Sequence, residues 1–301
     1  MKEIKNILIC GAGMMGKNIG YVFASNPSFQ VGMYDLYPTD VEAGIRTNTR
    51  QLLDKGVITE QELSDRLSRI SFTNDIDSDL VKNADLVIEA VFEDMKIKRE
   101  TFAKLEARCR PDTIFCTNSS VMSPSEISAE LKHRERFVGT HFWNPGHLIP
   151  LVEVVKSDAS SDEVAQTVME VLRSVGKKPV LCKKDVPGFI ANRMQHALWR
   201  EAISIVENGI ADAATVDEAV RYSFGLRLPQ LGPMENADMV GTDLTYNIHD
   251  YILRDLEDSH EPSPLSSSSA MRARSASRPA RASRSGRLSR SPSPTPSSMS
   301  I

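Results

Sequence analysis

The sequence is poor in the features that mark several common classes of protein. Its four cysteines include no C-x-x-C pair, so we expect buried thiols in a reducing compartment and predict no metal site. No run of about 18 apolar residues occurs, which argues against a membrane span or a membrane partner. The first apolar run follows residues 1–5 directly and leaves no room for a signal peptide. We therefore expect a cytoplasmic protein.

The chain also lacks a strong charge of either sign. A net charge of −4 gives no general reason to expect nucleic-acid binding. The balance is uneven, because residues 265–301 contain seven Arg, fourteen Ser and no acidic residue. Without those seven positive charges the first 264 residues carry −11. Composition therefore predicts a boundary near Pro264, followed by a Ser/Arg/Pro-rich disordered tail over 265–301.

A glycine-rich turn stands at the start of the chain. The apolar run 6–10 ends in Gly11-Ala12-Gly13-Met14-Met15-Gly16, and a helical pattern begins inside it. In a G-x-G-x-x-G turn between a strand and a helix, the first glycine allows the turn and the second leaves room for a pyrophosphate. The third lets the helix pack close to the sheet, and the helix N-terminus offers free amides. This context predicts dinucleotide binding.

An acidic residue follows the second predicted strand, residues 30–35. Asp35 lies 24 residues after Gly11, where this fold places the acid that binds the adenosine ribose. The next residues are Leu36 and Tyr37 rather than an arginine that would neutralise a 2′-phosphate. The spacing therefore predicts NAD, rather than NADP, as the cofactor.

Strand and helix patterns alternate as far as residue 186. Apolar strands are predicted at 84–90, 113–118, 151–155 and 178–182, with a further one in the stretch 137–145, and helices lie between several of them. From Pro187 only helical spacing remains. We predict an α/β chain with a Rossmann-type, doubly wound, mostly parallel sheet in residues 1–186. A smaller all-helical domain is predicted over 187–264.

One histidine stands where catalysis is expected. His141 falls at the carboxyl end of a predicted strand, as do Asn118, Ser119 and Ser120, and Glu153 lies in the following strand. Histidine is the commonest general base near neutral pH, and a carboxylate partner fixes its tautomer. Oxidation of a secondary alcohol by NAD needs such a base. From position alone, a core histidine bonded to backbone explains His141 equally well.

Five separated motifs give a more specific signal. They are Asn118-Ser119-Ser120, Glu93 with Lys98, Gly139-Thr140-His141-Phe142-Trp143-Asn144-Pro145, Leu151-Val152-Glu153-Val154, and Pro187-Gly188-Phe189-Ile190-Ala191-Asn192-Arg193. In the order and spacing of these motifs, the chain resembles the 3-hydroxyacyl-CoA dehydrogenase family over residues 4 to about 257.

The resemblance implies a role for each matching residue. His141 would be the base for oxidation of an L-3-hydroxyl group and the acid in reverse, and Glu153 would orient and stabilise it. Ser120 and Asn192 would hydrogen-bond the substrate oxygen or the histidine region. The helical domain would cap the substrate cleft and supply a homodimer interface.

Other residues are expected to hold the cofactor. Asn118 would contact cofactor and substrate together, and Asn144 would support the end of the catalytic strand. The complete set predicted at the NAD site is Gly11, Gly13, Met14, Met15, Gly16, Asp35, Glu93, Lys98, Asn118 and Asn144.

Three departures from the family pattern leave the substrate open. Trp143 stands where fatty-acyl members commonly have Phe, and 146–150 replaces an apolar Pro-Val-Met-like run. The helix that would meet CoA phosphates carries Arg46 and Arg50, which could equally be a solvated face. An L-3-hydroxyacyl-CoA is the expected substrate. Relatives that oxidise carnitine, gulonate or a pyridine carboxylate share some of these motifs, and a non-catalytic NAD-binding protein is a further alternative.

The tail suggests a shift of reading frame. Residues 275–283 admit codons that, read one nucleotide over, encode Gly-Phe-Lys-Thr-Gly-Glu-Gly-Phe, which resembles the usual end of the family's helical domain. We hypothesise a frameshift near Pro264 or Leu265, which would leave the helical domain shortened. The alternative is a basic disordered arm that binds nucleic acid or is phosphorylated, which we do not favour. The DNA sequence across codons 255–301 decides between them.

Overall fold

The computed structural model describes residues 3–266. The chain divides into two compact units, the first ending at Gln195 and the second beginning at His196. Each unit is described by itself. No helix in the described part of the chain is long and apolar enough to cross a membrane. Most of the predicted tail, from residue 267 onward, lies outside the described residues, and so does the segment that carries the frameshift hypothesis.

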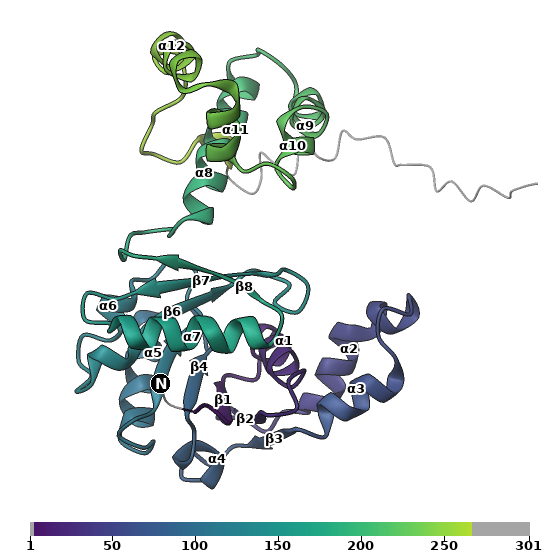
Figure 1. The fold of residues 1–301 in the computed structure, drawn as a ribbon, viewed down its shortest axis with the longest axis vertical. Coiled ribbons are helices and arrows are strands. Elements are labelled where there is room, and N and C mark those ends of the chain that lie inside the picture. Colours follow the sequence, from purple (N-terminus) through teal and green to yellow (C-terminus); the bar gives the residue numbers. More distant parts are fainter. Residues whose placement is uncertain (1–2, 267–301) are drawn as a thin grey trace, which may run out of the picture. The chain divides into compact units, whose positions relative to one another are not determined.

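The first unit is built on one eight-stranded sheet (Figure 1). The strand order is β3-β2-β1-β4-β5-β6-β7-β8. The strands are β1 (Asn6–Cys10), β2 (Gln30–Tyr34), β3 (Ile70–Thr73), β4 (Leu86–Glu89), β5 (Ile114–Thr117), β6 (Phe137–Phe142), β7 (Leu151–Lys156) and β8 (Lys178–Cys182).

Helices cover both faces of this sheet. One face packs against α1 and α7, while α2 lies against α1 and α3 against α2; these helices supply residues such as Phe23, Ile45, Leu63 and Leu172 to the larger apolar core. The other face packs against α4, α5 and α6. Their bounds are α1 (Met14–Phe23), α2 (Val41–Asp54), α3 (Glu60–Leu67), α4 (Asp79–Lys82), α5 (Met95–Glu106), α6 (Pro124–Ile127) and α7 (Asp162–Ser174), with a 3-10 turn at Arg134–Arg136. Because both faces are covered, β4 and β5 are buried along their whole length.

One pair of strands breaks the parallel pattern. β6 and β7 run antiparallel, whereas every other pair in the sheet is parallel. The connection between them, residues 143–150, is too short for the dozen or more residues that a parallel crossover needs. This pairing places His141 directly opposite Glu153.

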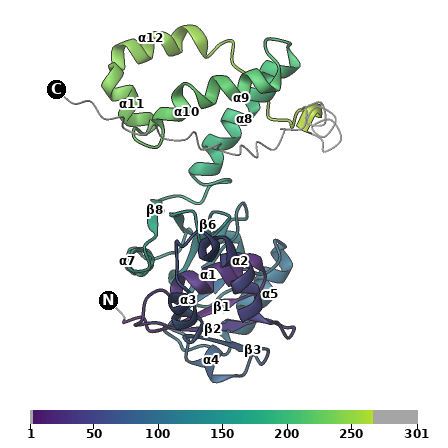
Figure 2. The same cartoon turned by 90° about the vertical axis from the view of Figure 1, so that its right-hand side faces the viewer.

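The second unit is helical in its described part. It contains most of α8 (Ala191–Glu207), then α9 (Ala213–Arg221), α10 (Phe224–Arg227), α11 (Pro233–Val240) and α12 (Thr242–Ile252), and ends in a 3-10 turn at Pro264–Ser266 (Figure 2). The start of α9 carries a side-chain cap, since Asp212 accepts a hydrogen bond from the Thr215 amide at 2.7 Å.

This architecture confirms the predicted fold class, a mostly parallel doubly wound sheet followed by helices. Several short elements were not predicted from the sequence. Among them, β3 is a four-residue edge strand, and α4 is a single turn. The division between the units falls inside α8, whereas the change of sequence pattern begins at residue 187.

Candidate active site

The glycine turn has the shape that a dinucleotide requires. Gly11 has a φ of +107°, and a Cβ there would lie 2.6 Å from the Ala90 carbonyl oxygen. A Cβ at Gly16 would lie 1.8 Å from the Gly11 oxygen, so α1 packs tightly against the turn. At Gly13, by contrast, a Cβ would meet nothing within 4 Å. The residues present therefore fit a pyrophosphate placed against Gly13 at the N-terminus of α1, which begins at Met14 and continues with Met15.

Asp35 is held beside this turn. Its Oδ2 accepts the Ala12 amide at 2.7 Å, and its Oδ1 accepts the Tyr37 amide at 3.2 Å. Both partners are backbone amides, which hold the carboxyl group at the strand end where it can accept the hydroxyl donors of a ribose. Leu36 and Tyr37 are largely exposed. This uncharged surface suits NAD better than NADP, because it offers no cation to the 2′-phosphate of NADP.

A buried ion pair lies at the end of β4. The Lys98 ammonium is 2.7 Å from Glu89 Oε1 and 3.1 Å from Glu93 Oε2. The side chains of Lys98 and Glu89 are 1% and 0% exposed, whereas that of Glu93 is 40% exposed. The structure thus brings the expected cofactor residues Glu93 and Lys98 together, with Glu93 as the one that solvent reaches.

Glu89 is a functional candidate that the sequence reasoning did not single out. Besides Lys98, it accepts the Thr117 hydroxyl and the Val91 amide, at 2.7 and 2.8 Å. Burial raises the pKa of Glu89, and the charge of Lys98 acts against that rise. The available signal was an acidic residue inside an apolar strand, nine positions before a lysine.

Glu93 joins this pair to the loop after β5. It accepts hydrogen bonds from the Ser119 hydroxyl and, at 3.1 Å, from the Ser120 amide. Although partial burial opposes it, the hydrogen bond from Ser119 and the charge of Lys98 hold the pKa of Glu93 below its usual range. Glu93 is therefore an anion that fixes the position of Ser120.

His141 and Glu153 form the centre of the site. The His141 Nδ1 lies 2.8 Å from Glu153 Oε2, and the two side chains are 6% and 0% exposed. A carboxylate can only accept, so the proton of a neutral His141 sits on Nδ1, and Nε2 keeps a free lone pair. This is the arrangement of a general base with a partner that stabilises its charged form.

The chain segment after β8 completes the carboxylate's environment. Glu153 Oε1 accepts the Ile190 and Ala191 amides, each at 2.9 Å. Gly188 and Phe189 have positive φ values, which turns these amides toward the carboxylate. Although burial opposes it, hydrogen bonds from His141 and the two amides hold the pKa of Glu153 below its usual range. Glu153 is thus a stable anion behind His141.

Three asparagines were predicted here, and two of them tie the site together. Asn118 Oδ1 accepts the Phe142 amide at 2.9 Å, joining the ends of β5 and β6. Asn192 Nδ2 donates to the Ser120 carbonyl oxygen at 3.3 Å. Asn144 lies exposed after β6, before a cis peptide bond to Pro145. His141, Glu153, Ser120, Asn118 and Asn192 therefore converge, whereas Asn144 stands at the margin.

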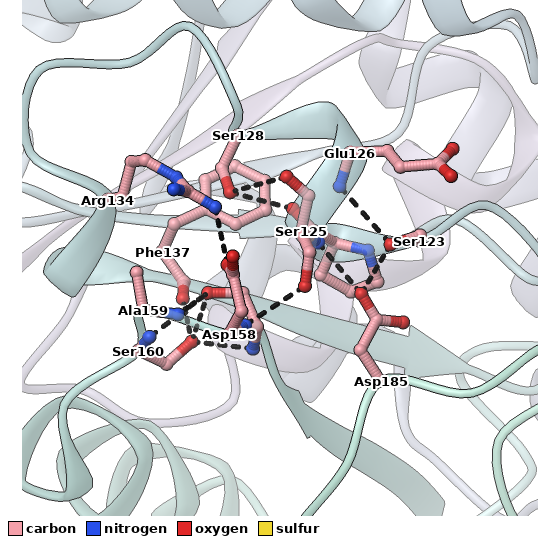
Figure 3. A network of polar contacts seen from close by, with 12 residues as sticks. Ser123, Ser125, Glu126, Ser128, Arg134, Phe137, Asp158, Ala159, Ser160 and Asp185 are labelled. Atoms are coloured by element: carbon pink, nitrogen blue, oxygen red, sulfur yellow. Dashed lines mark hydrogen bonds and ion pairs between the residues drawn. The ribbon is translucent and has the colours of Figure 1, made fainter.

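A second polar network anchors the loop that carries Ser120 (Figure 3). Asp185, which follows β8, accepts the Ser123 hydroxyl and, at 2.9 Å, the Ser125 amide at the start of α6. The Ser125 hydroxyl in turn accepts the Asp158 amide at 3.0 Å. These contacts fix the loop after β5 to the segment that leads to Ile190.

The two arginines of α2 are engaged on the helix surface. Arg46 bonds to Glu42 at 2.9 Å and also to Glu60. Arg50 lies 3.9 Å from Asp54 and is largely exposed. Arg46 therefore has its charge matched by two carboxylates, and Arg50 is the more available cation for a phosphate.

Comparison with known proteins identifies the family. A model of the 3-hydroxyacyl-CoA dehydrogenase NAD-binding domain matches residues 6–186, and one of that family's C-terminal domain matches residues 188–283. The chain belongs to the 3-hydroxyacyl-CoA dehydrogenase family. As a member, it is an NAD-dependent oxidoreductase that acts on CH–OH groups, which confirms the predicted enzyme class and cofactor.

Relatives within this family differ in substrate. The chain is 37% identical to a probable 3-hydroxybutyryl-CoA dehydrogenase of Bacillus subtilis, covering 87% of this chain and 91% of the relative. It is 33% identical to 5-formyl-3-hydroxy-2-methylpyridine 4-carboxylate 5-dehydrogenase of Mesorhizobium japonicum, covering 87% and 84%. A crystal structure of an NAD⁺-dependent enzyme of the latter name superposes with a TM-score of 0.79 at 34% identity, covering 89% of this chain and 87% of that one.

Proposed function

We propose that this enzyme oxidises an L-3-hydroxyacyl-CoA to the 3-ketoacyl-CoA, with His141 as general base and Glu153 as its partner. The observation that carries the proposal is the buried 2.8 Å contact between His141 Nδ1 and Glu153 Oε2, next to the loop that holds Ser120. Family membership supplies the reaction class, and the similarity to 3-hydroxybutyryl-CoA dehydrogenases supports the thioester.

The chain's own residues account for the proton. Nε2 of His141 takes the hydroxyl proton, and the negative charge of Glu153 stabilises the imidazolium that results. Ser120 and Asn192 lie together and can hold the substrate oxygen. The glycine turn and Asp35 would hold NAD, which would supply the hydride acceptor when bound. In the reverse direction the imidazolium returns the proton to the carbonyl oxygen.

A pyridine carboxylate or another free 3-hydroxy acid is the second candidate for the substrate. The TM-score of 0.79 to the pyridine-carboxylate enzyme supports it. So does Arg46, whose charge is already matched by Glu42 and Glu60. A site for a small anion needs no cation at this position, whereas the phosphates of CoA favour one.

The substrate assay is the direct test. We expect NADH to form fastest from 3-hydroxybutyryl-CoA, with a kcat/KM at least 10-fold above those for carnitine, gulonate and a hydroxymethyl-pyridine carboxylate; 10-fold corresponds to about 1.4 kcal/mol of transition-state binding. NADH formation from a free acid alone would transfer the proposal to that substrate. No activity on any of them would leave family membership intact and remove the thioester assignment.

We further propose that the enzyme is a homodimer that uses the helical unit. None of the hydrophobic side chains in the described part of that unit is fully buried, and large ones stand open on α11 and α12, such as Met234 at 79% and Tyr251 at 82% exposure. Exposed apolar surface of this extent marks an association site. A second copy of the chain offers a self-complementary partner.

Light scattering across protein concentrations tests the dimer. We expect twice the mass of one chain, and a shift toward the monomer when Met234 and Tyr251 are replaced by Asp, because a charge cannot be buried there without a partner. Val57→Asp, at an exposed position after α2, is the matched control and should leave the mass unchanged. A monomer at every concentration would exclude the dimer.

A further inference from the structure

One oxygen of Glu153 serves two aromatic side chains. Oε2 accepts from His141 Nδ1 at 2.8 Å and from the Trp143 indole Nε1 at 3.3 Å. The two rings lie beside each other, with centroids 5.6 Å apart and planes inclined at 52°. Trp143 follows His141 by two residues, just after β6 ends, so the two side chains reach the same acceptor from one short segment. The indole therefore competes directly with the imidazole for negative charge.

The other carboxylate oxygen of Glu153 is also hydrogen-bonded. Glu153 is fully buried and its Oε1 is taken by the Ile190 and Ala191 amides. Each donor to a carboxylate stabilises the anion and disperses its charge. A more dispersed charge stabilises a neighbouring imidazolium less. Of the four donors, Trp143 is the one, apart from His141 itself, that a side-chain substitution removes.

We propose that Trp143 is a positioning residue whose hydrogen bond to Glu153 weakens the electrostatic stabilisation of the His141 imidazolium. His141 therefore stays unprotonated, and able to act as a base, at a lower pH. The inference rests on the proposed role of His141 as general base. It deepens that role by naming the group that sets the pH range of oxidation. A phenylalanine at this position would lack the indole donor.

Other ionisable groups occur on the elements that flank this site, but none hydrogen-bonds to His141 or Glu153 among residues 3–266. Burial raises the pKa of the Cys182 thiol, so it adds no charge near neutral pH. These groups are Glu126 in α6, Cys182 in β8, Lys183, Lys184 and Asp185 after β8, and Arg193 in α8.

The reaction in the two directions should respond oppositely. Oxidation of the alcohol requires the neutral imidazole, whereas reduction of the ketone requires the imidazolium. Withdrawing the indole donor concentrates charge on the Glu153 oxygen that faces His141. The imidazolium then persists to higher pH, which slows oxidation at neutral pH and extends reduction toward alkaline pH.

Trp143→Phe tests the proposal, because phenylalanine keeps an aromatic ring and lacks the donor. We expect the acid limb of the kcat/KM profile for oxidation to move up by about 0.5–1 pH unit, the effect of withdrawing part of one charge-assisted hydrogen bond. The alkaline limb for reduction should move by the same amount. Trp199→Phe is the matched control, because Trp199 is half-exposed in α8 and packs against His196. It should leave both limbs in place.

Two further measurements separate the possible failures. NMR titration of the His141 ring in the NADH-bound enzyme follows its protonation without turnover, and its midpoint should rise in Trp143→Phe. If that variant unfolds, benzothienylalanine at position 143, in a Trp199→Phe background, replaces the N–H by sulfur with little change of shape. Unmoved limbs and an unmoved midpoint would overturn the role of Trp143. An oxidation rate indifferent to His141→Ala would instead overturn the proposed function.

Discussion

Replacing His141 with alanine should lower kcat for alcohol oxidation by about 10²- to 10⁴-fold, the usual contribution of a general base. The imidazole of His141 contacts Glu153, whose negative charge stabilises the imidazole once it has taken up the proton. Without the imidazole, the hydroxyl proton must pass to water as hydride leaves. Stopped-flow measurement of NADH formation, with saturating substrate and NAD, gives the rate of this step.

The fall in rate should be confined to chemistry. The glycine turn and Asp35 are separate from His141 in the sheet, so NADH should bind to His141→Ala with the affinity it has for the native enzyme, as measured by fluorescence. His133→Ala is a suitable control, since His133 lies near the surface and pairs with Glu135 at 3.3 Å. A kcat within about threefold of the native value in His141→Ala would be incompatible with a general base at this position.

The sheet and its functional edge were predictable because local patterns specify them. The strand before Gly11, the acid at Asp35 and the strand that carries His141 each have their signal within a few residues. The pairing of His141 with Glu153 follows from two adjacent strands joined by a short connection, which forces an antiparallel register. These features are encoded where they occur, so periodicity and spacing reach them.

The partners of the buried charges were not predictable in this way. Lys98 looked like a cofactor residue, and only the fold shows that it lies against Glu89, on a neighbouring strand end. The indole of Trp143 was visible as a departure from the family pattern. Its hydrogen bond to Glu153 depends on how β6 ends and on the amides of residues 190 and 191. Contacts of this kind depend on side-chain geometry in three dimensions, which one-dimensional spacing does not carry.

The Lys98–Glu89 pair should also be the most sensitive point for stability in the first unit. Replacing Lys98 with methionine leaves a fully buried carboxylate without its cation, and removing one partner of such a pair costs about 3–5 kcal/mol. Urea unfolding of the native and variant proteins measures the difference. Lys96→Met, on the same helix but 84% exposed and 4.0 Å from Glu100, is the matched control and should cost less than about 1 kcal/mol.

The pH dependence identifies the cause of that loss. Burial already raises the pKa of Glu89 above its ordinary value of 4.5, and losing Lys98 raises it further. A carboxyl whose folded-state pKa is raised binds its proton more tightly in the native state, so the free energy of unfolding falls as pH rises from about 4.5 through the folded value. The deficit of Lys98→Met should therefore be largest at neutral pH and shrink as the pH is lowered toward 4.5.

Adding Glu89→Gln removes the unpaired charge and should recover most of the loss at pH 7. A deficit that stays constant with pH, or that the second substitution deepens, would mean that Lys98 stabilises the fold by packing and not by its charge.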